Sequence, residues 1–385
     1  RGRMEPRSEK MPGGEAKGLA SNQSSVVGLV VVTLGNGKHA GAASEIIATA
    51  LKQEGVRGVE FKIDQKVGDM MGNSLKSIRD YLRVTYEPKE MVPDGYEVNI
   101  VFQDRDQRVD GPSAGTAMAL MLDSLFSGEK IDDQFACTGG ITPNGKVTSI
   151  GGVAAKIRGA TRRKCQIVGV PEANAKGVND ILVLDGVQQL LDIQVFTIKD
   201  MDQARALSRA EKDRDVQNTL DDFKAIAEVV GEQGEKVLQN GRVQEKLEAV
   251  LEKMPNHISA QLLLDHARGK APEKLSVGGS FHEIDSRASG VLSRVQMSML
   301  RKKDPSDLSD FKEDAQATMG ELLQIEGKVH EKFEDYYAAA MDLCGAIQET
   351  LNIAANPTIR EKWEKVSKMR KKLSEDPEIM EEIRG

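Results

Sequence analysis

Short apolar runs with the character of β-strands recur along the chain as far as residue 200. Val26–Leu34 is rich in β-branched residues and is followed by Gly-Asn-Gly, which predicts a strand that ends in a turn. Apolar and polar residues alternate in Gly58–Asp64 and in Tyr96–Phe102, and this period of two predicts half-buried strands. Two shorter strands are predicted at Ile167–Pro171 and Gln194–Ile198.

Helical segments lie between these strands. They are predicted at Ala43–Gln53, Met71–Val84, Ala114–Phe126 and Val153–Lys164. The third segment is apolar almost all round, which predicts a largely buried helix. The flanks of the Pro-Asn-Gly turn, 135–138 and 147–150, predict a hairpin. Because strands and helices mix without a strict βαβ repeat, the fold class we expect is α+β.

The pattern changes after residue 200, where strand signals stop and charged helical segments continue to the end. Val243–Arg268 divides at Met254–His257 into two amphipathic helices, which fits either a tetratricopeptide-like unit or an ordinary helical hairpin. Leu275–Phe281 has the composition of a Gly/Ser loop. Two or three long helices, forming a bundle or coiled region, are then expected, interrupted at Asp304-Pro305 and Asn356-Pro357. The expected domains are a disordered tail at 1–24, an α+β domain at 25–200, a helical segment at 201–274 and the helical bundle at 282–385.

Composition narrows the classes of function. The 385 residues carry a net charge of -7, which argues against a general nucleic-acid-binding protein. No stretch reaches the roughly 18 apolar residues of a membrane span, and the histidines lack the spacing of metal ligands, so neither a membrane span nor a metal site is expected. The three cysteines form no CxxC pair and are expected to be buried thiols, which favours a reducing compartment such as the cytoplasm.

The region around Val26–Leu34 also allows a second interpretation. This apolar run follows a tail with several basic residues and precedes Ala40-Gly41-Ala42, as in a signal peptide with its cleavage site. The tail is long and interrupted by Gly and Pro, and the run is valine-rich like a strand, so we prefer the strand. Because the sequence begins with Arg1, a periplasmic location stays open.

The segment Asp110–Gly115 (Asp-Gly-Pro-Ser-Ala-Gly) places a serine at the start of a predicted helix. Proline suits the first helical turn, and the two glycines permit unusual backbone angles and close approach. Free N–H groups at a helix N-terminus can stabilise an oxyanion, as acyl transfer requires. Ser113 is therefore a candidate nucleophile, although such a serine taken alone is more often an N-cap.

Lys156 follows two glycines within a run of small apolar residues. A lysine acts as a base near neutral pH only when loss of solvation lowers its pKa. The apolar neighbours Val153 and Ile157 favour that environment. The alternative is a solvated helix lysine, and a solvent-facing position is expected for the basic residues that follow: Arg158, Arg162, Arg163 and Lys164.

One segment mimics a phosphate-binding loop. Gly140–Lys146 matches GxxxxGK, but the next residue is Val147, so the hydroxyl that would bind magnesium is missing. The Pro-Asn-Gly in its middle is better explained as a hairpin turn. No nucleotide site and no cofactor are expected.

At these residues the chain resembles the proteolytic domain of Lon proteases. The family carries the Asp-Gly-Pro-Ser-Ala-Gly segment, here at Asp110–Gly115, and a TGxI…GxVxxIGGxxxK segment, here at Thr138–Lys156. Further similarity lies at Val67–Met71 and Ile167–Asn174, so that the resemblance covers residues 25–200. It implies an α+β fold and assembly into homo-oligomeric, hexameric rings.

Carried over residue by residue, the resemblance implies that Ser113 is the nucleophile and Lys156 its general base. Thr138 would help to hold the lysine, and Asp110 stands where the family's segment switches between active and inactive forms. The backbone N–H groups of Ser113 and its neighbours would bind the oxyanion. The supporting residues are therefore Thr138, Asp110, Gly111 and Ala114.

The chain departs from the usual family pattern in several places. Lon proteins normally carry an ATPase domain upstream, where this sequence has a short polar segment, and the long helical region downstream is not a standard family element. The usual lysine before the serine segment is Val109, and the glutamate of the upstream Met-x-Glu-Ser turn is Asn73. These changes leave Ser113 and Lys156 in place and bear on substrate delivery and activation.

The function predicted from the sequence is an ATP-independent serine endopeptidase that cleaves unfolded or exposed polypeptides. One alternative keeps this chemistry in a protease subunit that works with a separate ATPase. Another is an inactive scaffold whose helical half binds a protein partner. A polypeptide is the expected substrate, and neither nucleic acid nor membrane is an expected partner.

Overall fold

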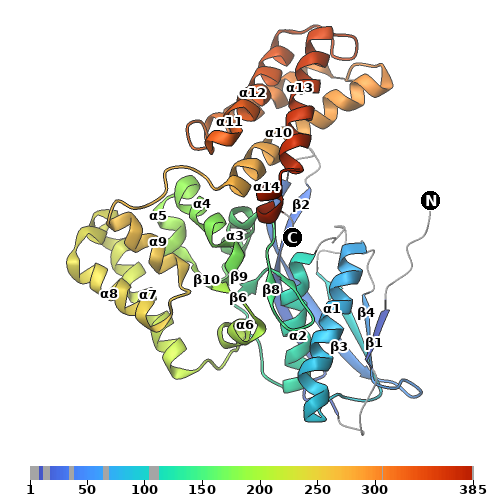
Figure 1. Ribbon diagram of the computed structural model, residues 1–385, viewed down its shortest axis with the longest axis vertical. Coiled ribbons are helices and arrows are strands. Elements are labelled where there is room, and N and C mark those ends of the chain that lie inside the picture. Colours follow the sequence, from blue (N-terminus) through green and yellow to red (C-terminus); the bar gives the residue numbers. More distant parts are fainter. Residues whose placement is uncertain are drawn as a thin grey trace.

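The computed structural model describes residues 8–11, 18–33, 39–63, 69–103, 112–305 and 307–383. Within these ranges, strands are concentrated in the first half of the chain and the second half is helical (Figure 1). In the described part of the chain, eight strands form one mixed sheet in the order β1-β4-β5-β3-β2-β6-β9-β10, and β7 pairs with β8 separately. The strands are β1 (Ser8–Met11), β2 (Gln23–Thr33), β3 (His39–Lys52), β4 (Val59–Ile63), β5 (Tyr96–Phe102), β6 (Phe135–Cys137), β7 (Gly140–Ile141), β8 (Val147–Thr148), β9 (Ile167–Pro171) and β10 (Gln194–Ile198).

Helices cover both faces of this sheet. One face packs against α1, α2 and α6 and the other against α3, α4 and α5, each with its own cluster of buried apolar side chains. The helices of this half are α1 (Asp69–Tyr86), α2 (Gly115–Ser127), α3 (Val153–Arg162), α4 (Ala175–Asp185), α5 (Val187–Asp192) and α6 (Met201–Ser208). The α+β fold class is thereby confirmed, and the first twelve residues of α2 are buried as the sequence predicted.

The helix predicted at Ala43–Gln53 is wrong, because these residues form most of β3. Ile46, Ala48 and Ala50 are buried on one face of the sheet, which is the period of a strand. β3 pairs antiparallel with β2 along eleven residue pairs and with β5 along seven. Hydrogen bonding on both sides of a central strand outweighs the helix propensity of an alanine-rich segment.

Two further differences concern β1 and the predicted hairpin. Residues 8–11 were predicted to lie in a disordered tail, but they form β1, which pairs antiparallel with β4; the rest of the first 17 residues lies outside the described ranges. The hairpin around Pro-Asn-Gly joins β7 to β8. The predicted first arm, β6, instead joins the main sheet parallel to β2 and β9, because it is apolar enough to be buried on both sides.

Three helices after the sheet do not form a core of their own. α7 (Arg214–Gln233), α8 (Gly241–Lys253) and α9 (Ile258–Ala267) share one apolar cluster with α3, α4, α5 and β10. The break predicted at Met254–His257 separates α8 from α9. His257 lies at this junction, fully buried between the rings of Phe196 and Phe223 at centroid distances of 4.3 and 4.4 Å.

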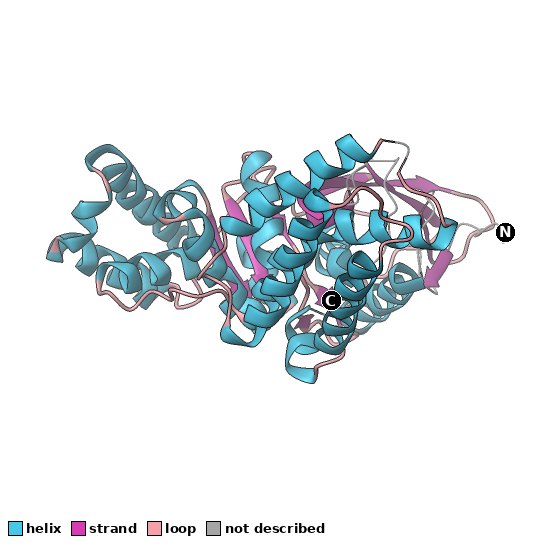
Figure 2. Ribbon diagram, turned by 90° about the horizontal axis from the view of Figure 1, so that it is seen from above, coloured by secondary structure: helices cyan, strands magenta, loops and turns pink. Residues whose placement is uncertain are grey.

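The remaining helices form a bundle with a separate apolar core. Figure 1 shows this bundle beyond the end of the sheet, and Figure 2 shows the same molecule from above. The predicted breaks at 304–305 and 356–357 are confirmed, and an additional break follows Leu323. The bundle consists of α10 (Val277–Arg301), α11 (Leu308–Leu323), α12 (Glu334–Glu349), α13 (Pro357–Ser374) and α14 (Pro377–Ile383).

The Gly/Ser loop predicted at Leu275–Phe281 is wrong, because most of it is the first turn of α10. Ser276 is the N-cap, and its hydroxyl accepts a hydrogen bond from the N–H of Gly279 at 2.9 Å. The glycine is required by a neighbour: a Cβ on Gly279 would lie 1.8 Å from a carboxylate oxygen of Asp180. The small residues suggested a loop from their composition. They are needed because the start of α10 packs tightly against α4.

Candidate functional site

Ser113 lies in a single 3-10 turn, Pro112–Ala114, that leads directly into α2. Ser113 is half-buried, whereas Ala114 is fully buried. The carbonyl oxygen of Ser113 accepts two hydrogen bonds, one from the N–H of Gly139 at 2.9 Å and one from the hydroxyl of Thr138 at 3.1 Å. The serine turn is therefore fastened to the segment that connects β6 with β7.

Thr138 is the centre of this connection. Its fully buried hydroxyl lies within hydrogen-bond distance of two carbonyl oxygens, that of Ser113 and that of Leu29 on β2 at 3.4 Å. Its N–H donates to the carbonyl of Gly169 on β9 at 3.1 Å. Thr138 thus fastens the serine turn to the end of β6, an interior strand between β2 and β9.

Lys156 lies in the first turn and a half of α3 and is only 3% exposed. Burial of the ammonium group lowers its pKa from the ordinary value to about 7. Its neighbours along α3, among them Val153, Ala154 and Ile157, are apolar and are also buried. A lysine in this state is neutral for a substantial fraction of the time at physiological pH, as a general base requires.

The backbone of α3 is in direct contact with β3. A Cβ on Gly41 would lie 1.8 Å from the carbonyl oxygen of Ala155 and 2.7 Å from the nitrogen of Lys156. A Cβ on Gly159 would lie 2.9 Å from backbone atoms of Ala42. Glycine on each side lets the helix and the strand approach more closely than side chains would allow, and this close packing fixes the main chain of Lys156.

The predicted site residues fall into three groups. Ser113 and Thr138 are joined by a hydrogen bond. Lys156 comes from α3, and both α3 and the serine turn pack against β2. Asp110 and Gly111 lie outside the described residues.

The environments predicted for Arg158 and for the cysteines can be compared with the structure. Arg158 was expected to face solvent, but it is half-buried and pairs with Asp185 at 2.7 Å and with Glu283 at 3.3 Å. All three cysteines are buried, as predicted. In the described part of the chain no cluster of His, Cys, Asp or Glu fits a metal ion, and no helix there is both long and apolar enough to cross a membrane.

The segment that mimics a phosphate-binding loop is a tight turn. The N–H of Thr142 donates to the carbonyl of Lys146 at 3.0 Å, and Gly145 has a φ of +78°, which suits a glycine in a hairpin. It runs from one short strand to another, whereas a phosphate-binding loop leads into a helix whose N–H groups face the phosphate. The hairpin interpretation is confirmed.

Sequence reasoning missed two contributors to the site, Leu29 and Gly41. Leu29 acts through its carbonyl oxygen, which any residue provides, so its type carries no signal. Gly41 did carry one, because a glycine inside a strand often marks a close backbone approach. It was concealed by the mistaken assignment of part of this strand as a helix.

Comparison with known proteins identifies the first half of the chain. The model of the Lon protease (S16) C-terminal proteolytic domain matches residues 15–207, half of the chain. Lon protease 1 of Herpetosiphon aurantiacus is 34% identical over 139 residues, which cover 35% of this chain and 17% of that protein. Lon protease 1 of Bacillus subtilis is 34% identical over 119 residues, 30% of this chain and 15% of that protein.

A third relative, Lon protease 2 of Desulfotalea psychrophila, is 30% identical over 152 residues, 39% of this chain and 19% of that protein. The aligned regions thus span less than a fifth of the length of these relatives. The matched model is that of a proteolytic domain, and it covers the α+β half of the chain. The chain belongs to the Lon protease family.

Proposed function

We propose that this chain is a serine endopeptidase in which Ser113 is the nucleophile and Lys156 the general base, and that it cleaves unfolded or exposed polypeptides without ATP. The observation that carries the proposal is the burial of Lys156, which lowers its pKa to about 7. A solvated lysine would be almost wholly protonated at neutral pH and unable to accept a proton. The family match covers the same part of the chain.

The reaction follows from the properties of these groups. Neutral Lys156 takes the proton of the Ser113 hydroxyl while the oxygen attacks the scissile carbonyl carbon. The resulting oxyanion is stabilised by backbone N–H groups around the serine turn, with Gly111 and Ala114 as the neighbouring residues. The protonated lysine then gives its proton to the leaving amine, and water releases the acyl group from Ser113 with the same lysine as base.

The resemblance assigned Thr138 to holding Lys156. Its hydroxyl lies near the carbonyl oxygens of Ser113 and Leu29, so Thr138 is proposed instead to fix the main chain of the nucleophile. Its hydroxyl and the N–H of Gly139 both bind the Ser113 carbonyl, which ties the serine turn to the segment after β6. Asp110 is proposed, from the family resemblance alone, to belong to the segment that switches between active and inactive forms. Polypeptide is the proposed substrate, and a homo-oligomeric ring the proposed assembly.

ATP independence is a separate part of the proposal. The GxxxxGK segment of this chain is a hairpin turn, so it does not support nucleotide binding. Cleavage without a motor would favour polypeptides that are disordered or open locally. The alternatives are a protease subunit fed by a separate ATPase, and an inactive scaffold whose helical half binds a partner.

Hydrolysis of casein by the purified chain, with and without ATP, tests these alternatives. The proposal expects cleavage in both conditions, and loss of cleavage in Ser113→Ala and Lys156→Ala. Cleavage that appears only when a cell lysate and ATP are added would favour a separate ATPase. No cleavage in any condition would favour the scaffold, and full activity of Ser113→Ala would refute the mechanism.

A further inference from the structure

The bundle reaches the helix that carries Lys156 through a buried carboxylate. Glu283 of α10 is 3% exposed and accepts a hydrogen bond from Arg158 of α3 at 3.3 Å. It is also paired with Arg287, one turn further along α10. Arg158 in turn donates to Asp185 at the end of α4 at 2.7 Å. Arg158 lies two positions after Lys156, so this ion-pair network is attached to the same turn of α3.

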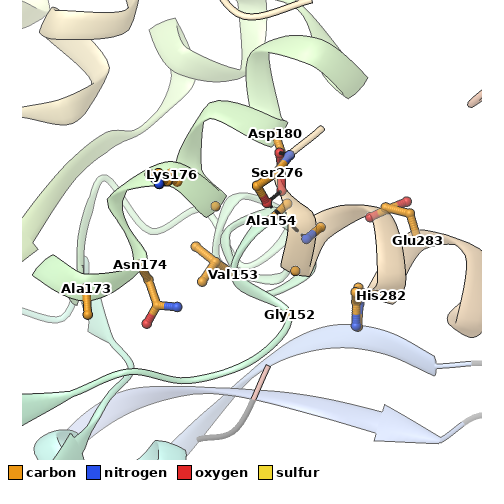
Figure 3. A pocket seen from close by; sticks show the side chains of 13 residues that line it. Gly152, Val153, Ala154, Ala173, Asn174, Lys176, Asp180, Ser276, His282 and Glu283 are labelled. Carbon is orange, nitrogen blue, oxygen red and sulfur yellow. Dashed lines mark hydrogen bonds between the residues drawn. The ribbon is translucent and has the colours of Figure 1, made fainter. Parts of the chain in front are cut away.

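A second contact from α10 is made at the other side of Lys156. Gly152, the N-cap of α3, has a φ of +68°. A Cβ on this residue would lie 3.1 Å from the ring of His282 and 3.1 Å from the side chain of Val31 on β2. Figure 3 shows His282 and Glu283 on α10 beside the start of α3. The turn with Lys156 is therefore contacted by α10 both before and after the lysine.

The start of α10 is itself anchored to the α+β domain. Asp180 of α4 accepts hydrogen bonds from the N–H and the hydroxyl of Ser276, each at 2.7 Å (Figure 3). Asp180 is buried, and Gly279 leaves it room to reach the helix start. With its N-terminus fixed in this way, α10 presents His282 and Glu283 to α3 from a defined position.

Solvent reaches the outer side of α3 close to this contact. A hollow of about 460 Å³ is lined by Gly41 and Ala155 from the α+β domain and by residues of α10 and α11. The charged and titratable groups around it are Arg158, Arg162, His282, Glu283, Arg287 and Glu321. The hollow lies where α3, β3 and α10 meet, so displacement of α10 would widen it toward the turn of α3 that carries Lys156.

We propose that Glu283 is a positioning residue, which binds Arg158 and so presses α3 against the sheet, keeping Lys156 out of water in its basic form. The bundle is then part of the working enzyme. This inference rests on the proposed Ser113–Lys156 chemistry. Glu283 stays ionised despite burial, which alone would raise its pKa, because Arg287, Arg158 and His282 together lower the pKa below its usual value.

The test is the pH dependence of kcat/KM for cleavage of fluorescently labelled casein by the full chain, which reports ionisation of the free enzyme. The unmodified protein is expected to gain activity as pH rises through a midpoint near 7. In Glu283→Gln and Arg158→Gln the lysine becomes more hydrated, so the midpoint is expected to rise by about one unit. Cleavage at pH 6 then falls about tenfold, and part of the loss is regained at alkaline pH.

Asp285→Asn is the matched control, because Asp285 is also a buried carboxylate of α10 but pairs with Arg370 inside the bundle. It is expected to weaken the bundle and leave the midpoint unchanged. Circular dichroism checks folding. If Glu283→Gln does not fold, Arg158→Gln decides the matter, since it leaves the Glu283–Arg287 pair in place.

The outcomes that overturn the positioning role differ from the one that overturns the base. The contact between Glu283 and Arg158 is only structural if the pH midpoint is unchanged in both Glu283→Gln and Arg158→Gln. If Glu283→Gln does not fold, an unchanged midpoint in Arg158→Gln alone leads to the same conclusion. An equal shift of the midpoint in Asp285→Asn would do so too. Cleavage by Lys156→Ala with the same pH profile as the unmodified protein would instead refute the proposed base.

Discussion

Lys156 in the α+β domain and the acidic residues of α10 in the helical bundle are buried in different ways. Lys156 is buried among apolar groups, and desolvation is the cause that lowers its pKa. In the bundle, Asp285 accepts hydrogen bonds from Arg370 and from the hydroxyl of Tyr336, and Glu283 is paired with two arginines. Burial changes the ionisation of Lys156, whereas pairing with arginines keeps Glu283 ionised.

This difference distinguishes a group that can exchange a proton in a reaction from groups that hold helices together. An ion pair keeps both partners charged over a wide pH range, so it holds helices together and cannot exchange protons near pH 7. A lone buried lysine costs folding free energy, because water no longer solvates its charge. Such a cost is typical of a group retained for reaction rather than for stability. The contact between Glu283 and Arg158 is where the two arrangements meet.

The largest effect is expected from the nucleophile and base themselves. Ser113→Ala and Lys156→Met should each lower casein cleavage about 10³-fold or more. Lys156→Met should also leave thermal stability unchanged or higher, because it replaces a desolvated amine with an apolar side chain of similar length. Lys176→Ala, at an exposed lysine near the start of α4, is the control and should retain activity. A marked loss of stability in Lys156→Met would mean that the lysine has a favourable buried partner.

Gly41→Ala tests whether close packing keeps Lys156 dry. The new methyl group would collide with the carbonyl of Ala155, so strand and helix must separate. We expect a loss of about 3 kcal/mol in the free energy of unfolding, the upper range for overpacking, and reduced cleavage at pH 7. Urea unfolding measures the first effect. Gly320→Ala, on α11 with open space around the glycine, is the matched control. Equal stability of the two variants would contradict the contact.

Asp285→Asn should break pairing in the bundle with little effect on the site. Arg370 and Tyr336 lose a charged acceptor, and the half-exposed Arg370 recovers part of its solvation from water. The expected cost is therefore about 2 kcal/mol, below that of a fully buried pair. Chemical denaturation measures it, while the pH midpoint of casein cleavage should stay in place. A loss of cleavage greater than the loss of folded protein would show that the bundle acts on the site through this pair as well.

His257 extends the comparison to a buried group that is neutral. Its ring accepts from the N–H of Ala260 through Nδ1 at 3.2 Å, and burial lowers its pKa to about 3. The unfolded chain takes up a proton below pH 6.5, the ordinary value, and the folded chain does so only near pH 3, so stability falls as pH decreases through this window. Between pH 7 and pH 5 the loss should be about 1 to 2 kcal/mol. His257→Gln should reduce this slope in urea titrations, and an unchanged slope would assign it to other groups.

Much of the fold could be predicted from the sequence, for reasons visible in particular segments. Tyr96–Phe102, Ile167–Pro171 and Gln194–Ile198 were assigned as strands with the bounds they have, because an apolar pattern and turn residues delimit them. The helix prediction for Ala43–Gln53 was wrong because helix propensity is a local property. The two strands that pair with this segment come from other parts of the sequence. The prediction at the start of α10 was wrong because its glycines were interpreted as a sign of a loop. In the structure they allow close packing of a helix.

The candidate site shows the same limit. Ser113, Thr138 and Lys156 could be selected from the spacing of glycines and the family resemblance. Arg158 was assigned to solvent because its partner Glu283 lies 125 positions away, on an element that no local pattern connects to α3. The pairing of residues across such a distance depends on how the bundle docks, which neither periodicity nor composition expresses.

The burial of Cys137, Cys165 and Cys344 has a practical consequence for spectroscopy. Burial raises the pKa of the Cys137 and Cys165 thiols, so little reactive thiolate is present at neutral pH. A single cysteine introduced at an exposed position, such as Leu300 near the end of α10, would therefore react with a maleimide dye or spin label in preference to the native thiols. A second label on an exposed residue of the α+β domain, such as Lys176, would then report the separation of bundle and sheet in solution, with the natural cysteines left unaltered.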